Sequence, residues 1–128
     1  MKAVFNPFTG ALDLIAGNAL AGVQALTGNG PLTINFALGR SVSLSLQGNT
    51  QISVINWPSA AYEGSLVLNI TNTGAFTITA WPSGSRAGNG VSPTIAAGAG
   101  AKTSIVLRTN DGGATVFVDQ IAYAYQAI

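Results

Sequence analysis

Residues 41–55 read Ser-Val-Ser-Leu-Ser-Leu-Gln-Gly-Asn-Thr-Gln-Ile-Ser-Val-Ile, and this stretch decides the fold class. In its first half, Val42, Leu44 and Leu46 alternate with serines. A period of two is typical of a strand with one buried and one solvated face. The pair Gly48-Asn49 predicts a turn, after which the alternation resumes. The stretch therefore predicts two half-buried strands joined by a turn.

The same alternation recurs further along the chain, over residues 66–70, 76–80, 102–109 and 114–120. The last two segments flank Asn110-Asp111-Gly112-Gly113, a strong hairpin signal because Asp-Gly tolerates positive φ. Short strands that follow one another at intervals of about 8–12 residues are typical of a β-sandwich or β-barrel. We therefore expect an all-β fold, an antiparallel β-sandwich or barrel-like module, with residues 121–128 as a last strand or a docked tail.

Two segments of the chain echo each other, residues 52–59 and residues 76–83. Each runs from an apolar, alternating stretch into Trp-Pro-Ser, at Trp57 and at Trp81. Proline cannot donate a hydrogen bond to a central ladder, so each strand is expected to end there. The repeat predicts two similar sheet corners, with both indoles largely buried at the ends of their strands.

Residues 1–31 differ in character from the rest of the chain. Their first ten residues place Phe5 and Phe8 in an irregular, proline-containing peptide. Residues 11–26 leave two alternatives open, because their apolar spacing is helical whereas their glycines and asparagines weaken a helix. Residues 27–31, Thr-Gly-Asn-Gly-Pro, form a cluster of helix and strand breakers. The organisation expected is an N-terminal docking peptide, 1–31, followed by a β-rich oligomeric module, 32–128.

Charged residues are scarce in this chain. They make up 7% of it, with a net charge of +1, against about 25% in an ordinary soluble domain. Little charged surface remains to keep a monomer in solution, so the chain is expected to hide surface against copies of itself or a larger assembly. The small net charge argues against a nucleic-acid partner. Polar residues within 11–26 argue against membrane insertion.

The residue types that carry chemistry are also scarce. The chain has no His and no Cys, which removes the usual metal ligands and most nucleophile–base pairs. The four carboxylates are those of Asp13, Glu63, Asp111 and Asp119. Glu63 with Asp119 is the only pairing worth considering for a glycosidase, which needs two facing carboxylates. We expect no enzyme, no catalytic residue, no metal and no cofactor.

A glycine-rich stretch, residues 84–90, follows Trp81. It lacks the Gly-Lys-Ser/Thr ending of a phosphate-binding loop. Two interpretations stay open: a flexible connector, or a surface-contact loop that uses Trp81, Arg86 and Asn89 against a glycan or another protein.

Three stretches together resemble virion proteins of tailed bacteriophages. Residues 5–13, Phe-Asn-Pro-Phe-Thr-Gly-Ala-Leu-Asp, are similar to the N-P-F-T-G-x-L-D peptide near the start of phage appendage proteins. Residues 23–29, Val-Gln-Ala-Leu-Thr-Gly-Asn, are similar to a V-Q-x-L-T-G-N segment that often follows it. Residues 76–95 resemble the T-L-T-W-P-S…G-x-x-P-T-L signature of a β module in phage tail fibres. Such motifs usually sit in longer fibres, and here they occur within 128 residues.

The resemblance implies a homotrimeric structural protein of the virion, assembled in the bacterial cytoplasm. It implies a short tail-fibre or baseplate appendage, docked on a baseplate, tail or major capsid protein. The alternatives are a trimeric capsid decoration (cement) protein and, more remotely, a carbohydrate-binding β module that contacts a host glycan. The residues expected to dock on the virion are Phe5, Asn6, Pro7, Phe8 and Leu12.

Overall fold

The computed structural model describes residues 3–6, 11–14 and 22–128, and it describes side chains over 22–128. The all-β prediction is confirmed, since the only helical elements in these residues are two 3₁₀ turns. The strands are β1 (Ala3–Asn6), β2 (Ala11–Leu14), β3 (Val23–Asn35), β4 (Ser41–Ile55), β5 (Gly64–Asn72), β6 (Ile78–Ala80), β7 (Ser85–Ala87), β8 (Lys102–Thr109) and β9 (Val116–Tyr123). The 3₁₀ turns are η1 (Phe36–Leu38) and η2 (Gly88–Gly90).

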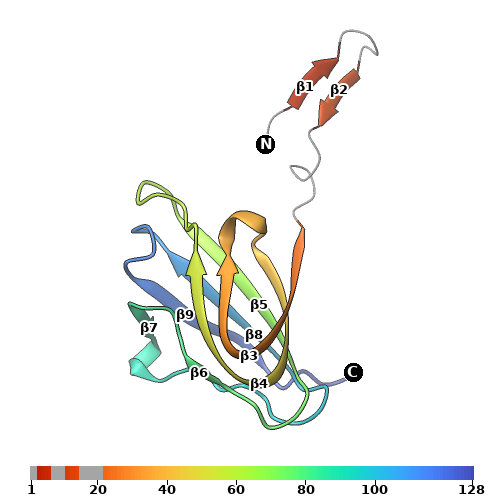
Figure 1. The fold of residues 1–128 in the computed structure, drawn as a ribbon, viewed down its shortest axis with the longest axis vertical. Coiled ribbons are helices and arrows are strands. Elements are labelled where there is room, and N and C mark those ends of the chain that lie inside the picture. Colours follow the sequence, from red (N-terminus) through yellow and green to blue (C-terminus); the bar gives the residue numbers. More distant parts are fainter. Residues whose placement is uncertain (1–2, 7–10, 15–21) are drawn as a thin grey trace.

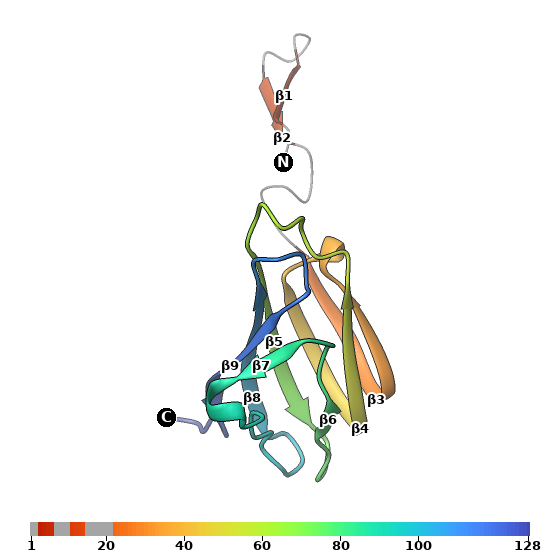
Figure 2. The same cartoon turned by 90° about the vertical axis from the view of Figure 1, so that its left-hand side faces the viewer.

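Seven strands form one mixed sheet in the order β3-β4-β5-β8-β9-β7, with β6 on β4 (Figures 1 and 2). The pairs β5–β8 and β8–β9 are antiparallel, as expected. The expectation of antiparallel pairing is wrong for the other pairs in this sheet. Strand β4 pairs in parallel with β3, β5 and β6, and β7 pairs in parallel with β9. For β3, β4 and β5 the physical reason is that β3 and β4 each bend back on themselves, so the chain returns to the same end of the sheet before β4 and before β5 (Figure 1).

Strand β4 is continuous through Gly48-Asn49, where the sequence predicts a turn. The first half of β4 pairs with β5, and its second half pairs with β6. The bent sheet therefore folds over into two layers, and β4 belongs to both of them (Figure 2). Figure 1 shows β3 and β4 turning back together at the lower end. The turn predicted at Gly48-Asn49 is thus replaced by a bend within one strand, because β4 stays paired with β3 on both sides of it.

The bend in β3 explains its cluster of breaker residues. The parallel register with β4 shifts between Gly28 and Gly30, so residues 27–31 lie inside a strand rather than between elements. A Cβ on Gly28 would lie 2.6 Å from the Thr50 hydroxyl, which is buried under the bend. Glycine is therefore needed at position 28 by close approach.

The beginning of the module differs from the sequence-based expectation. Strand β3 starts at Val23, so the expected boundary at residue 31 falls inside it. The helix alternative for residues 11–26 is wrong where the structure describes them, since 11–14 and 23–26 are strands. Residues 15–21 lie outside the described part of the chain.

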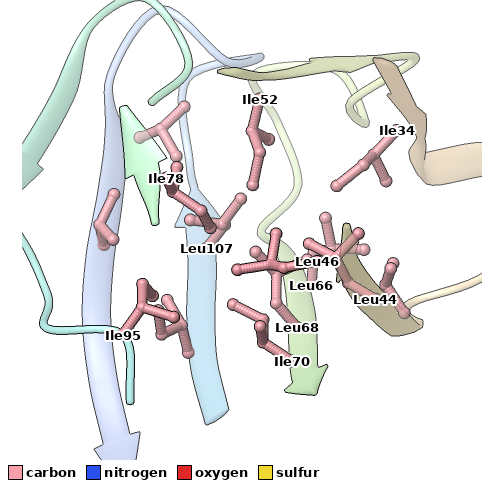
Figure 3. Close-up of a cluster of buried hydrophobic side chains, with 14 residues drawn as sticks. Ile34, Leu44, Leu46, Ile52, Leu66, Leu68, Ile70, Ile78, Ile95 and Leu107 are labelled. Carbon is pink, nitrogen blue, oxygen red and sulfur yellow. The ribbon is translucent and has the colours of Figure 1, made fainter. Parts of the chain in front are cut away.

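The core lies between the two layers and receives the inward face of each alternating strand (Figure 3). Leu66, Leu68 and Ile70 of β5 are at most 1% exposed. Burial of a side chain of this size contributes about 1.5–3 kcal/mol to the free energy of folding. The remaining buried hydrophobic residues of the cluster are Ile34, Val42, Leu44, Leu46, Ile52, Ile78, Ile95, Ile105, Leu107, Val116 and Val118.

The predicted hairpin between β8 and β9 is confirmed. Gly112 and Gly113 both have positive φ, 73° and 93°. The Asp111 carboxylate accepts hydrogen bonds from the Thr115 amide at 2.8 Å and from the Thr109 hydroxyl at 2.9 Å. These bonds, the Thr115 amide first, hold the pKa of Asp111 below its ordinary value. Asp111 is therefore a residue of the hairpin turn, as its place in the Asn110–Gly113 signal predicts.

Candidate functional site

The N-terminal residues expected to dock on a partner fall in a small separate sheet. Strands β1 and β2 pair antiparallel, which makes Phe5 and Leu12 register partners and sets Asn6 opposite Ala11. Neither strand pairs with the seven-stranded sheet. Pro7 and Phe8 lie outside the described residues. An isolated two-stranded ribbon is marginally stable in water.

The second candidate site is a groove of about 610 Å³ beside β7. It brings Trp81 and Arg86 together, as the surface-contact interpretation of the sequence requires. Pro82, Gly90, Pro93 and Val118 also line it. Asn89 is exposed next to the lining residue Gly90, and its φ of 55° is a left-handed conformation that asparagine tolerates. This volume is within the range of pockets that hold small ligands.

The floor of the groove is held by the loop between β6 and β7. Ser85 donates from both its amide, at 3.1 Å, and its hydroxyl, at 2.6 Å, to the carbonyl oxygen of Pro82. The Val116 amide donates to the Gly84 carbonyl at 3.1 Å, which ties this loop to β9. Gly84 has a φ of +79°, and a Cβ there would clash with the Ala114 carbonyl oxygen. The backbone on this side of the groove is therefore held by hydrogen bonds and by close packing at Gly84.

The opposite rim, which includes Pro93, is anchored to the core by two buried polar residues. The Asn72 amide nitrogen donates to the Ala96 carbonyl at 3.0 Å. The Ala96 amide donates to the Thr103 hydroxyl, also at 3.0 Å. Asn72 and Thr103 are 0% and 1% exposed. Sequence reasoning missed both residues, since a polar residue at the end of a strand gives no signal about a partner 24 positions away.

Arg86 is the charged residue among the described residues that line the groove. The other described cations are engaged: Arg108 bonds Asp119 at 2.9 Å, Lys102 donates to the Thr71 hydroxyl at 3.1 Å, and Arg40 lies 5.5 Å from the centre of the Phe36 ring. Within the described part of the chain, Arg86 is exposed and has no ion pair or aromatic partner. No acidic side chain lines the groove. Arg86 pairs with Phe117 on β9, so its side chain lies on the face of the sheet opposite Val118.

Trp57 and Trp81 occupy similar corners, as the sequence echo predicts. Their strands lie side by side in parallel, with Thr50 opposite Ile78. Both indoles are half-buried against the core, so the expectation of largely buried rings is only partly met. Trp57 packs on Phe36 with ring centres 5.2 Å apart, and a Cβ on Gly113 would clash with its indole. Both corners border a hollow: Trp81 lines the groove beside β7, and Trp57 lines a smaller one of about 400 Å³ with Pro82 and Gly113.

The carboxylates do not form a catalytic pair. Register sets Gly64, next to Glu63, opposite Thr109 and sets Asp119 opposite Val106, on the two sides of β8. The Cα atoms of Glu63 and Asp119 are therefore roughly 15 Å apart. Glycosidases hold their carboxyl groups about 5–9.5 Å apart. In the described residues no group of three or more potential ligands could hold a metal ion.

Comparison with protein families, with characterised proteins and with solved structures gave no match to this chain. No helix in the described residues has the length and apolar character needed to cross a membrane.

Proposed function

We propose that this chain is a non-enzymatic structural component of a tailed-phage virion, a short tail-fibre or baseplate appendage that self-associates as a homotrimer. The virion assignment is supported by the three sequence stretches that resemble phage appendage proteins. The observation that carries the structural role is the open edge of β3, since it offers a ready surface for assembly.

Strand β3 is a long edge with little protection. It has 13 residues, none of them charged, and among the described strands it pairs only with β4. Natural proteins guard such edges with lysines, prolines or bulges, because an open ladder pairs with other chains. The register shift at Gly28/Gly30 and the proline at position 31 protect its second half. Residues 23–28 keep an open ladder, with Val23 62% exposed.

The association is expected to be between copies of this chain. A closed cyclic oligomer covers the β3 edge of every copy, because each edge packs against the next copy. An edge covered in this way does not need charged residues to prevent further association. Light scattering at micromolar concentration is expected to give three times the chain mass of 12.9 kDa. A monomer mass would contradict the assembly part of the proposal.

Docking on the particle is assigned to the N-terminal hairpin, through Phe5, Asn6, Pro7, Phe8 and Leu12. The partner is a baseplate, tail or major capsid protein. Removal of residues 1–21 leaves β3 intact and is expected to give a folded oligomer that is absent from particles. Truncated protein that loads normally onto particles would contradict this role for the hairpin.

Gold-labelled antibody against the chain, imaged on intact virions, separates the two locations in the particle. Label on the tail supports the appendage function, and label on the head supports the capsid decoration alternative. Particles without label, from a preparation in which a major virion protein labels well, would overturn the virion assignment. The carbohydrate-binding alternative is favoured by one observation, the Trp81 groove.

A further inference from the structure

We propose that residues 124–128 of one copy add as an extra strand to the open edge of β3 in the next copy. These residues, here called the tail, follow the end of β9 at Tyr123. The inference rests on the proposed self-association and deepens it, because it names the segment that covers the edge. Three features support it: a tail without a partner, an open ladder of matching length and character, and their places at opposite ends of the sheet.

The tail is uncharged in its side chains and is not packed on its own module. It reads Ala-Tyr-Gln-Ala-Ile, with Tyr125 52% exposed and Ile128 fully exposed. It leaves β9 through Ala124, whose φ of 53° is a left-handed conformation that alanine rarely adopts. Within the described residues, its one backbone bond to the module runs from the Tyr125 amide to the Lys102 carbonyl oxygen, at 3.2 Å. Tyrosine and isoleucine favour strands, so the tail is suited to a pairing that its own module does not supply.

The open half of β3 matches the tail in length and in character. Residues 23–28 carry no charged side chain, and neither does the tail. At about 3.3 Å per residue, the open ladder spans about 20 Å and the extended tail about 17 Å. A strand added to an edge is held by main-chain hydrogen bonds, so this pairing needs no charged side chain. The edge can therefore accept the whole tail.

The open edge and the tail lie at opposite ends of the sheet. Strands β4, β5 and β8 separate β3 from β9, and Figure 2 shows the C-terminus and β3 on opposite sides of the module. From β9 to a strand added outside β3 is roughly 24 Å along the sheet, five spacings between strands. The tail, at about 17 Å, is too short for that distance. The pairing is therefore between copies and not within one copy.

Pairing of two different surfaces also fits a ring better than other pairings of the β3 edge do. Two β3 edges paired with each other would form a two-fold interface, which closes as a dimer. The edge at the other end of the sheet, β7, has only 3 residues and carries Arg86, so shortness and charge guard it. A tail on an edge is a head-to-tail contact, in which every copy gives one tail and receives one. Such contacts close into the proposed ring of three.

Light scattering on the full-length chain and on a chain without residues 124–128 tests the tail. The truncated chain keeps every strand and every residue of the core, so it is expected to be folded by circular dichroism and monomeric. A monomer mass for the full-length chain would contradict the proposed self-association itself. A full-length oligomer whose truncated form is still an oligomer would overturn the role of the tail alone.

Disulfide trapping tests the pairing directly, because the natural chain has no cysteine. Full-length Ala25→Cys protein is mixed with protein that carries one cysteine in the tail, at each of residues 125–128 in turn to cover every register. Cα atoms of paired strands lie about 4.5–5.5 Å apart, within reach of a disulfide. Mass spectrometry is expected to find a disulfide between the two kinds of chain. Thr33→Cys is the control, because it is equally exposed but lies beyond the proline of β3. No cross-link to Ala25→Cys at any tail position, or equal cross-linking to Thr33→Cys, overturns the inference.

Discussion

Replacing Asn72 with alanine should destabilise the module strongly, because this buried amide ties three parts of the chain together. Its nitrogen donates to the carbonyl oxygens of Phe76, at 2.8 Å, and Ala96, at 3.0 Å. Its oxygen accepts longer bonds from the amides of Gly74 and Phe76, at 3.2 and 3.4 Å. The residue is 0% exposed, and every buried side-chain polar atom in the described residues has a partner.

The size of the effect follows from the groups left behind. Asn72→Ala removes the donor from two carbonyl oxygens, and an unsatisfied buried group costs about 1–3 kcal/mol. The sum for the two carbonyl oxygens, about 2–6 kcal/mol, is a large share of the 5–15 kcal/mol that stabilises an ordinary domain. For a module of this length the melting temperature should fall by roughly 10–20 °C.

Urea denaturation followed by fluorescence measures this loss, and two further variants separate its causes. Asn69→Ala is the control, because this exposed amide accepts one bond, from the Ser104 hydroxyl at 2.9 Å, and should cost about 1 kcal/mol. Asn72→Asp keeps the shape and turns the donor toward two carbonyl oxygens into an acceptor. It should destabilise at least as much as alanine at pH 7. A small effect of Asn72→Asp would refute the role given to the donated bonds.

Three further predictions concern the open edge, the groove and the hairpin turn. Ala25→Lys on the open half of β3 should convert the oligomer to a folded monomer by light scattering, whereas Thr33→Lys, beyond the proline, should leave the oligomer intact. Trp81→Ala should cost about 1.5–3 kcal/mol by urea denaturation, less than a fully buried tryptophan, because the indole is half-buried; a cost near zero would argue against its packing on the core. Because the pKa of Asp111 is lowered on folding, its contribution to stability is present above about pH 4 and is lost as pH falls through the folded value. Asp111→Ala should therefore flatten the acid side of a melting-temperature profile, and an unchanged profile would contradict the turn hydrogen bonds.

Local patterns were enough to predict an all-β fold and several of its strands. Alternation marked the buried faces of β4 and β5 because side chains of a strand point to opposite sides whatever their partner strand is. The Asp111 turn could be predicted because its glycines and carboxylate act within six residues. The scarcity of His, Cys and charge needs no structure at all.

The candidate site was only half predictable. Trp81 and Arg86 are five positions apart and could be grouped by sequence, whereas Val118 enters the groove from β9 and Pro93 reaches it through the bonds of Asn72. Val118 and Pro93 are distant in sequence from Trp81 or are held by distant residues, and no local pattern predicts which strands will pair with one another.

The sequence by itself determined which residues of the alternating strands face the core and where the β8–β9 hairpin turns, since both depend on neighbours along the chain. The tertiary structure decided the parallel register, the path of β3 and β4, and the groove. A Gly-Asn pair permits both a turn and a bend. What selects the bend is the continued pairing of the two strands, with Gly28 packed on the Thr50 hydroxyl across 22 positions. Contacts of that separation form only when the whole sheet forms.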